Sequence, residues 1–275
     1  MKLGLIGLGK QGRRYLETKN GGDSIAAVLS RDGFALTVHE NRRTLVHLPW
    51  GPFLEQCDAI IIATPAETHA ELAIRCLEAG KPVLVEKPLA TNWVDCARVI
   101  HTAEKNSLPL LVGHTHLFAE SFHNRPEIRP SFITEAEFGG PCHGDPSVEW
   151  GSHLVAMALA VAEGKRVTQV GHRRESDLSY IGVEFDGGDL QGFGAHARMT
   201  VYRDWNSRWF AVWHSPDKET GARTRWHYDP DAPSEHTALW HQVEAFKRMC
   251  AGEADKRGSY QFARQVYSTL FGEMQ

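Results

Sequence analysis

The stretch KLGLIGLGKQG, residues 2–12, decides the fold of this chain. Its apolar start over residues 2–6 predicts a buried strand, and a stretch that favours a helix follows to about residue 19. Between them lie Gly7, Gly9 and Gly12, which have the Gly-x-Gly-x-x-Gly spacing of a dinucleotide-binding loop. The alternative is a glycine-rich turn without a ligand. The strand before the glycines and the helix after them favour the loop, because that is the context in which it binds phosphate.

Each glycine has a physical role in such a loop. The first allows the tight turn after the strand, the second lets the backbone approach a pyrophosphate, and the third lets the helix pack close to the strand. The helix N-terminus adds N–H donors and the positive end of the helix dipole. We therefore predict dinucleotide contacts from Gly7, Gly9, Lys10, Gln11 and Gly12.

The rest of the first half alternates strand and helix patterns. Strands are predicted at residues 24–29, 57–63, 83–85 and 108–112. Helices are predicted at 67–79 and 93–105, the latter with Thr91 as its N-cap. This alternation predicts a doubly wound parallel sheet, the Rossmann arrangement, over residues 1–115. Residues 31–54 fit less well: we expect a short strand at 44–48, preceded by a shortened or absent helix.

The end of the second strand bears on the choice between NAD and NADP. An acidic residue there would bind the ribose 2′-hydroxyl of NAD, but this chain has Ser30 and Arg31. A hydroxyl and a guanidinium suit a 2′-phosphate, because arginine forms charged bidentate hydrogen bonds with phosphate. Asp32 follows directly and could turn inward instead, and Arg31 could be a solvated loop residue. We predict an NAD(P) cofactor, with NADP favoured.

The second half, residues 116–275, predicts an α+β domain with a large, mostly antiparallel sheet. Strand patterns occur at residues 166–171, 179–185, 190–197, 198–203, 209–214 and 223–228, and helices at 154–162, 239–249 and 259–272. Four tryptophans, Trp205, Trp209, Trp213 and Trp226, cluster in the strand region. Such a face either packs against another subunit or lines a sugar site. We predict a homo-oligomer formed through this sheet.

Composition excludes several classes of partner. The net charge is −4 and the pI about 6.4, which gives no indication of nucleic acid or an anionic membrane as partner. No apolar run approaches the roughly 20 residues that span a bilayer, and the apolar start runs directly into the glycine loop, which indicates a strand and not a signal peptide. The five cysteines are scattered without a CxxC pair, so we expect a reduced, cytoplasmic location.

Lys87 stands in the triplet Glu86-Lys87-Pro88, directly after the apolar run 83–85. A lysine at the end of a buried strand should be solvated or paired, not packed. Ligands of doubly wound sheets bind outside the carboxyl ends of the strands. We therefore expect Lys87 at the ligand edge of the sheet.

These motifs, taken together, resemble the Gfo/Idh/MocA oxidoreductase family. The resemblance rests on the glycine loop, Ala63-Thr64-Pro65 with His69, Glu86-Lys87-Pro88 and Glu149-Trp150-Gly151-Ser152-His153. It implies a Rossmann domain followed by an α/β domain with a large, mostly antiparallel sheet. It also implies oxidation or reduction of sugars, cyclitols and related carbonyl compounds with NAD(H) or NADP(H), with Lys87 as a catalytic residue. Further cofactor contacts are expected from Thr64, Pro65, His69, Glu86 and Lys87.

Hydride transfer needs groups that exchange a proton with the substrate oxygen and stabilise charge on it. Lys87 is expected to hydrogen-bond that oxygen. His153 is the best proton-transfer candidate, because imidazole titrates near neutral pH; alternatively it is a satisfied buried residue that opens the helix 154–162. Glu149, four residues earlier, could orient the ring or tune its basicity. The family usually has Asp at this position, whereas this chain has Glu149, whose side chain is one methylene longer.

The segment Gly113-His114-Thr115-His116-Leu117-Phe118 follows the last Rossmann strand. Its counterpart in the family links the two domains and lines the pocket near the nicotinamide. We predict His114, His116 and Trp150 as lining of the substrate pocket. The His-x-His pattern also raises a metal site, completed by His123 or His143, but no known metal-ligand spacing occurs, so no metal is predicted.

Two functional classes remain open. The first is an NAD(P)-dependent oxidoreductase acting on a sugar-like or small carbonyl substrate. The second is a non-catalytic dinucleotide-binding sensor or scaffold of the same fold. A reductase of a larger conjugated substrate, such as a tetrapyrrole, would use the fold without needing Lys87 and His153. The presence of both residues favours the first class.

Overall fold

The computed structural model describes residues 1–18, 25–30, 34–39, 42–47, 49–126, 132–140, 144–175, 178–186, 195–203, 208–214, 225–229 and 237–273. The chain forms two compact units. The first consists of Met1–Thr115 and Leu239–Arg264, and the second of His116–Ala238 and Gln265–Gln275. The N-terminal part of the first unit ends at Thr115, and Leu239–Arg264 belong to the same unit.

The first unit contains a seven-stranded sheet in the order β4-β3-β2-β1-β5-β6-β7. Its strands are β1 (Leu3–Ile6), β2 (Ile25–Leu29), β3 (Phe34–His39), β4 (Arg42–His47), β5 (Ala59–Ile62), β6 (Val83–Glu86) and β7 (Leu110–Gly113). Strands β2, β1, β5, β6 and β7 are parallel. The central strands β1, β5, β6 and β7 are buried along their whole length, as expected of a parallel sheet covered on both faces.

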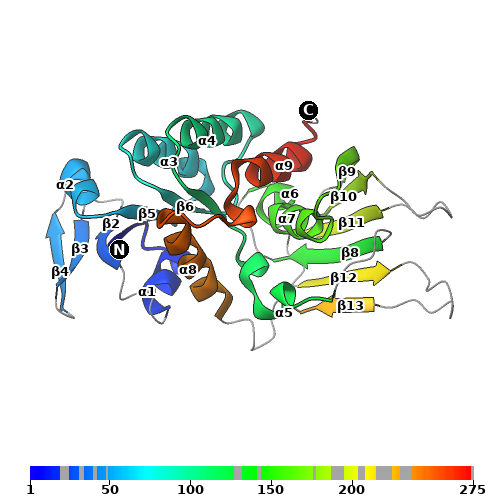
Figure 1. Ribbon diagram of the computed structural model, residues 1–275, viewed down its shortest axis with the longest axis horizontal. Coiled ribbons are helices and arrows are strands. Elements are labelled where there is room, and N and C mark those ends of the chain that lie inside the picture. Colours follow the sequence, from blue (N-terminus) through cyan, green and yellow to red (C-terminus); the bar gives the residue numbers. More distant parts are fainter. Residues whose placement is uncertain are drawn as a thin grey trace. The chain divides into compact units, whose positions relative to one another are not determined.

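Helices cover both faces of this sheet. They are α1 (Lys10–Glu17), α2 (Trp50–Glu55), α3 (His69–Glu78), α4 (Trp93–Lys105) and α8 (Ala238–Cys250), with the 3-10 turns η2 (Ala66–Thr68) and η5 (Lys256–Gly258). Figure 1 shows α3 and α4 on one side of the sheet and α1 and α8 on the other. The N-cap of α4 is Asn92, whose side chain accepts the Asp95 N–H at 2.9 Å, so the prediction of Thr91 was wrong by one residue.

The irregular segment 31–54 holds a hairpin, not a crossover helix. Strand β3 pairs antiparallel with β2, and β4 pairs antiparallel with β3. A parallel crossover needs a dozen or more residues between strands. Because only residues 30–33 separate β2 from β3, the chain reverses and extends the sheet by two strands, of which β4 forms the edge.

The second unit contains a six-stranded sheet in the order β13-β12-β8-β11-β10-β9. Its strands are β8 (Phe132–Gly139), β9 (Val167–Arg174), β10 (Leu178–Phe185), β11 (Ala195–Tyr202), β12 (Arg208–His214) and β13 (Arg225–Tyr228). All neighbours are antiparallel except β8 and β11. The sequence did not predict β8, although it lies between β12 and β11 in the sheet. The predicted fold class, a Rossmann sheet followed by a mostly antiparallel sheet, is confirmed.

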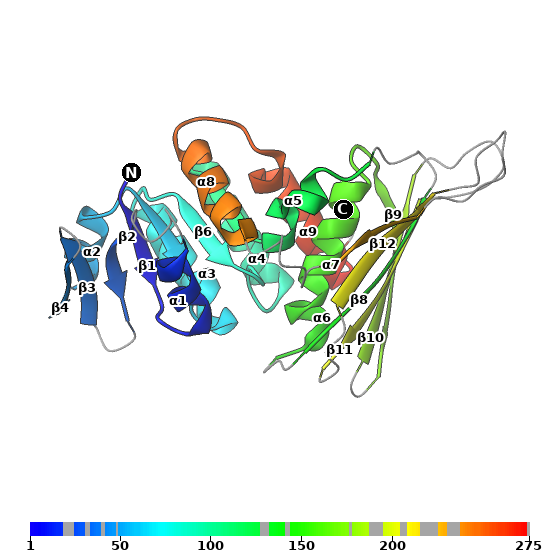
Figure 2. The ribbon, with the colours of Figure 1, turned by 90° about the horizontal axis from the view of Figure 1, so that it is seen from below.

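Helices of the second unit lie against one face of this sheet. They are α5 (Glu120–His123), α6 (Pro146–Glu149), α7 (Gly151–Val161) and the end of α9 (Tyr260–Phe271), preceded by the 3-10 turn η3 (Thr115–Phe118). Figure 2 shows α6 and α7 beside the strands β8, β10 and β11. Alternate residues of β8, β10 and β11 are buried beneath them, among them Phe138, Ile181 and Met199.

The tryptophans predicted as one cluster divide between the two faces of the sheet. Trp226 lies on the helix side, with its ring 5.7 Å from Phe122 and 6.3 Å from Tyr228. Trp209 and Trp213 alternate with the buried Phe210 and Val212 and therefore face the other way. Trp205 lies outside the described residues.

Candidate functional site

The glycine loop after β1 has the backbone that the sequence predicts. Gly7 has φ +101°, a conformation that favours glycine. A Cβ added to Gly12 would lie 2.1 Å from the Gly7 carbonyl oxygen, so only glycine fits there. A Cβ added to Gly9 would meet no atom within 4 Å, so the space beside this residue is open. The loop is therefore tight where the helix packs and open where a ligand would approach.

Helix α1 begins directly at this open space. Gly9 is its N-cap and supplies no side-chain cap, and the first turn carries no acidic residue. The first intrahelical hydrogen bond runs from the Arg13 N–H to the Gly9 carbonyl oxygen at 3.0 Å. The N–H groups of residues 10–12 thus have no acceptor within the helix, which is the arrangement that binds an anion. The loop and this helix terminus fit a dinucleotide pyrophosphate.

The other predicted site residues of the first unit lie just after the ends of its parallel strands. The glycine loop follows β1, Thr64 and Pro65 follow β5, Lys87 follows β6 and His114 follows β7. Because these strands are parallel neighbours, their carboxyl ends lie at one edge of the sheet. Lys87 is half-buried there and His114 is buried. Ser30 follows β2, whereas Arg31 lies outside the described residues.

A buried hydrogen-bond network holds the residue before Lys87. The Glu86 carboxylate accepts from the Tyr15 hydroxyl at 2.6 Å and from the Gln11 amide at 2.8 Å. The Gln242 side chain of α8 donates to the Tyr15 oxygen at 2.9 Å. Burial, and then the adjacent Glu86 carboxylate, raise the pKa of Tyr15 well above its ordinary value, so the phenol stays a donor. Glu86 and Gln11, predicted as cofactor contacts, thus bond to each other.

His69 links two segments of the same edge. Its Nδ1 lies 2.7 Å from the Pro88 carbonyl oxygen and its Nε2 lies 2.9 Å from the Thr64 carbonyl oxygen. The side chain is 1% exposed. Carbonyl oxygens only accept, so a ring nitrogen of His69 that carries a proton donates to the carbonyl oxygen beside it. His69 was predicted to contact the cofactor; here its ring lies between the backbone that follows Lys87 and the backbone that follows β5.

In the second unit, Glu149, Trp150 and His153 lie where α6 meets α7. The Glu149 carboxylate accepts the Gly144 N–H at 2.6 Å. The Trp150 indole donates to the Gly140 carbonyl at 3.1 Å, and its ring covers Gly140, where a Cβ would lie 3.0 Å from Cζ2. These bonds join Gly140 and Gly144 to the residues where α6 meets α7.

His153 lies within a cluster of rings, which we call the histidine–ring cluster: His116, Phe138, His153 and Tyr228. The His153 ring is 6% exposed and lies 4.7 Å from the His116 ring and 6.2 Å from Phe138, centroid to centroid. The Nδ1 of His116 lies 3.1 Å from the Tyr228 hydroxyl. The sequence analysis did not identify Phe138 or Tyr228. The alternation of Phe132, Thr134, Ala136 and Phe138 would have identified β8 and hence Phe138.

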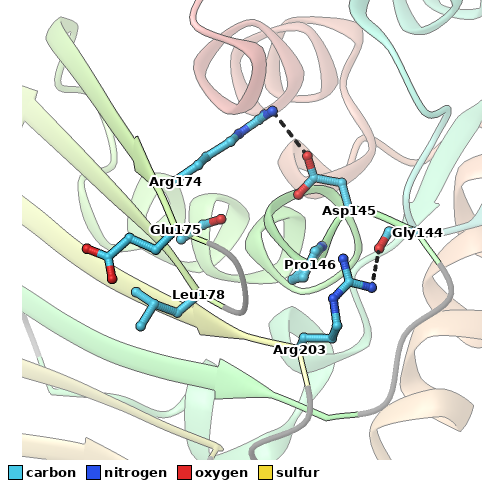
Figure 3. Close-up of a pocket in the computed structure, with 8 residues that line it drawn as sticks. Gly144, Asp145, Pro146, Arg174, Glu175, Leu178 and Arg203 are labelled. Carbon is cyan, nitrogen blue, oxygen red and sulfur yellow. Dashed lines mark hydrogen bonds and ion pairs between the residues drawn. The ribbon is translucent and has the colours of Figure 1, made fainter.

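A pocket of about 440 Å³ lies at the ends of β9, β10 and β11 in the second unit. Figure 3 shows that its lining includes Arg174, paired with Asp145 at 3.3 Å, and Arg203, which donates to the Gly144 carbonyl at 3.3 Å. The remaining lining residues are Pro146, Glu175, Leu178 and Ser179. Gly144 thus joins the pocket wall to the Glu149 carboxylate.

The structure gives no indication of a metal or a membrane span within the part of the chain that it describes. There, no three His, Cys, Asp or Glu side chains gather as ligands of one metal ion. His123 is exposed at the end of α5, and His143 lies outside the described residues. None of the described helices combines the length and the apolar character needed to cross a membrane.

Comparison with known proteins relates the first unit to a large enzyme family. Residues 1–114 match the sequence model of the Gfo/Idh/MocA oxidoreductase family, NAD-binding Rossmann fold. The chain is 34% identical over 134 residues to 4-carboxy-2-hydroxymuconate-6-semialdehyde dehydrogenase of Sphingobium sp., a match that covers 46% of this chain and 42% of that protein. It is 38% identical over 130 residues to inositol 2-dehydrogenase 2 of Saccharopolyspora erythraea, which covers 44% and 38%. The chain thus aligns with less than half the length of these curated relatives.

Solved structures match the fold over nearly the whole chain. UDP-N-acetylglucosamine 3-dehydrogenase of Acidithiobacillus ferrooxidans superposes with a TM-score of 0.73 at 18% identity, covering 99% of this chain and 96% of that one. Apo scyllo-inositol dehydrogenase of Lactobacillus casei superposes with a TM-score of 0.69 at 12% identity, covering 99% and 94%. At these identities the likeness establishes the fold alone.

Residues 1–114 thus match the Gfo/Idh/MocA oxidoreductase family, which supports the resemblance carried by the glycine loop, Ala63-Thr64-Pro65 with His69, and Glu86-Lys87-Pro88.

Proposed function

We propose that the chain is an NAD(P)-dependent oxidoreductase that transfers a hydride between a nicotinamide and a sugar-like or small carbonyl or alcohol substrate. One observation carries the proposal. An open glycine loop at a helix N-terminus and a half-buried lysine follow strands β1 and β6 of one parallel sheet. The dehydrogenases of cyclitols and of a semialdehyde among the relatives support this substrate class.

When bound, the cofactor would supply the hydride acceptor or donor. The N–H groups of Lys10, Gln11 and Gly12 would hold its pyrophosphate, because they lie at the positive end of α1. Thr64 and Pro65, after β5, would contact the cofactor at the same edge of the sheet. Ser30 and Arg31 favour the 2′-phosphate of NADP.

Lys87 and His153 would each act on the substrate oxygen, in different roles. The Lys87 ammonium would hydrogen-bond that oxygen and stabilise negative charge on it. The His153 imidazole would take up or return the proton. The Glu149 carboxylate, which the Gly144 N–H fixes, would act on the histidine one turn further along. His114, His116 and Trp150 would line the substrate pocket.

The uncovered face of the six-stranded sheet would bind a second copy of the chain. Among the described residues, no helix lies on this face, and it carries Trp209 and Trp213 beside Glu135, Glu137 and Arg198. Aromatic rings with charges of both signs make a surface that can complement itself in a twofold dimer. Sedimentation of the wild-type protein and of Trp213→Glu tests this, and a monomeric wild type would contradict it.

We place the enzyme in the cytoplasm, because the four described cysteines are all free thiols. No nucleic-acid or membrane partner enters this proposal.

Coenzyme titration tests the proposed cofactor site. Nicotinamide fluorescence should rise with NADPH and less steeply with NADH. Gly9→Ala should weaken binding at least about tenfold, because the methyl group fills the space where phosphate would lie. Gly51→Ala is the matched control, since its Cβ also meets no atom within 4 Å but lies in α2. Tighter NADH binding would overturn the NADP preference, and no binding of either would remove the oxidoreductase proposal.

A further inference from the structure

The histidine–ring cluster joins four elements that are remote in sequence. His116 comes from η3, Phe138 from β8, His153 from α7 and Tyr228 from the edge strand β13. Phe138 is fully buried, Tyr228 is 1% exposed, and His116 is half-buried. Every ring centroid lies within 6.2 Å of a neighbour in the cluster. The imidazole of His153 is therefore packed against other rings on the side that faces His116.

The ring of His116 is fixed from two directions. Its Nδ1 forms a hydrogen bond with the Tyr228 hydroxyl at 3.1 Å, and its ring centroid lies 5.2 Å from that of Phe138 with the ring planes 82° apart. Tyr228 is in turn held by Phe122, at 5.6 Å, and by the pairing of β13 with β12. Because its own position is set by these contacts, His116 presents a fixed surface to His153.

We infer that His116 is a positioning residue for His153: its ring sets the orientation of the His153 imidazole and disfavours a second positive charge beside itself. The two rings lie 4.7 Å apart with their planes at 65°, so one ring meets the other edge to face. Two imidazolium ions at this separation repel each other, and the pair therefore titrates as a unit. A neutral His153 can accept a proton from a substrate hydroxyl, so the arrangement favours the form that the reaction needs.

Other titratable groups of the second unit lie on the elements around the pair. Glu149 precedes His153 by one turn and is bonded to the Gly144 N–H. Arg208 stands opposite Phe138 in the pairing of β12 with β8, with its guanidinium 5.8 Å from the Trp150 ring. Tyr228 completes the set through its bond to His116. These groups are the same in the wild type and in a His116 variant. A difference between the two in the titration of His153 is therefore due to His116.

Two substitutions separate the contributions of His116. His116→Phe keeps a flat ring against His153 but removes the titrating nitrogens. His116→Asn keeps an amide near the position of Nδ1 for the Tyr228 hydroxyl but removes the ring. His123→Gln on α5 is the control, because His123 is exposed and has no place in the cluster. Thermal unfolding of each variant shows whether the fold is retained.

Histidine NMR measures the coupling without any substrate. In protein labelled at the histidine ring carbons, His116 and His153 are assigned by the loss of their signals in His116→Phe and His153→Gln. Removing the neighbouring charge should move the titration midpoint of His153 to higher pH by at least about half a unit in His116→Phe. His116→Asn should move it in the same direction and also broaden the His153 signals, because the ring is then less confined. His123→Gln should leave the midpoint unchanged.

This inference rests on the proposed role of His153, but different results would overturn the role of His116 and the role of His153. In a turnover assay, the acidic limb of the kcat/KM profile should move with the NMR midpoint, and kcat should fall while KM stays within about threefold. A His153 midpoint and line width unchanged in folded His116→Phe and His116→Asn would overturn the role of His116. Full activity of His153→Gln would instead overturn the proposed role of His153, whatever the coupling.

Discussion

The two units hold their candidate reactive residues by different means. Around Lys87, the first unit uses polar contacts: the His69 ring lies against two backbone carbonyl oxygens, and Tyr15 and Gln11 donate to the buried Glu86 carboxylate. Around His153, the second unit uses packed rings. A buried polar network is disrupted when one member is lost, because its partner is left unsatisfied. Packed rings usually lose less stability when a replacement conserves their volume and shape. The first unit should therefore be the less tolerant of conservative substitution.

A pair of glycine substitutions gives the largest expected contrast. Gly12→Ala would place a Cβ 2.1 Å from the Gly7 carbonyl, which is backbone and has little room to move. Gly151→Ala would place one 2.8 Å from the tip of Ile181, a side chain that can turn aside. We expect Gly12→Ala to lower the free energy of unfolding by more than about 3 kcal/mol and Gly151→Ala by about 1 kcal/mol. Urea unfolding followed by circular dichroism measures both, and equal losses would contradict the contrast.

Removal of one hydroxyl from each unit sharpens the comparison. Tyr15→Phe takes a donor from the buried Glu86 carboxylate and leaves the Gln242 amide without its acceptor. We expect a loss of about 2 kcal/mol in unfolding free energy. Tyr228→Phe keeps the ring and affects a bond to the half-buried His116, so less than about 1 kcal/mol should be lost. A larger loss in Tyr228→Phe would show that the second unit also depends on hydrogen bonding.

The buried cysteines should cause a smaller loss of stability, at high pH. The four described cysteines all lie in the first unit. Burial raises the pKa of the Cys57 and Cys76 thiols from 9.0 to about 12. As the pH rises above 9.0, the unfolded chain releases these protons before the folded chain does, so the folded state loses stability. At pH 10 the loss should be about 1 kcal/mol for a fully buried thiol such as Cys76. Calorimetry at pH 8 and pH 10 measures it, and Cys76→Ala should reduce the difference.

The first unit was the more predictable from sequence, since its signals are local. The glycine loop and Glu86-Lys87-Pro88 each lie within a few consecutive residues, and β1 and β6 were predicted beside them. Of the hairpin, only the second strand was predicted, at residues 44–48, which overlap β4; β3 was not predicted, because a Rossmann pattern leads one to expect a helix there. The role of His69 was also missed, because its two carbonyl partners become adjacent to it only in the folded chain.

The second unit was less predictable because its site is assembled from distant segments. His116 and Tyr228 are 112 positions apart, and no spacing rule connects them. Phe138 lies on β8, a strand whose alternation was overlooked. The four tryptophans suggested one face, but strand register places Trp226 opposite to Trp209 and Trp213. Register decides the face of every strand residue, and composition does not reveal it.

Turnover by Lys87→Met and His153→Asn tests the central claim most directly, that these two residues carry one hydride-transfer reaction. The wild-type protein and both variants are assayed with NAD⁺ and NADP⁺ against a panel of cyclitols, sugars and hydroxy acids, by the absorbance of the reduced nicotinamide. We expect wild-type turnover with at least one polyol, and a fall in kcat of at least about 100-fold in each variant. His153→Asn should keep the coenzyme affinity of the wild type, as measured by fluorescence. Undiminished turnover in either variant, or coenzyme binding without turnover of any compound in the wild type, would contradict the account.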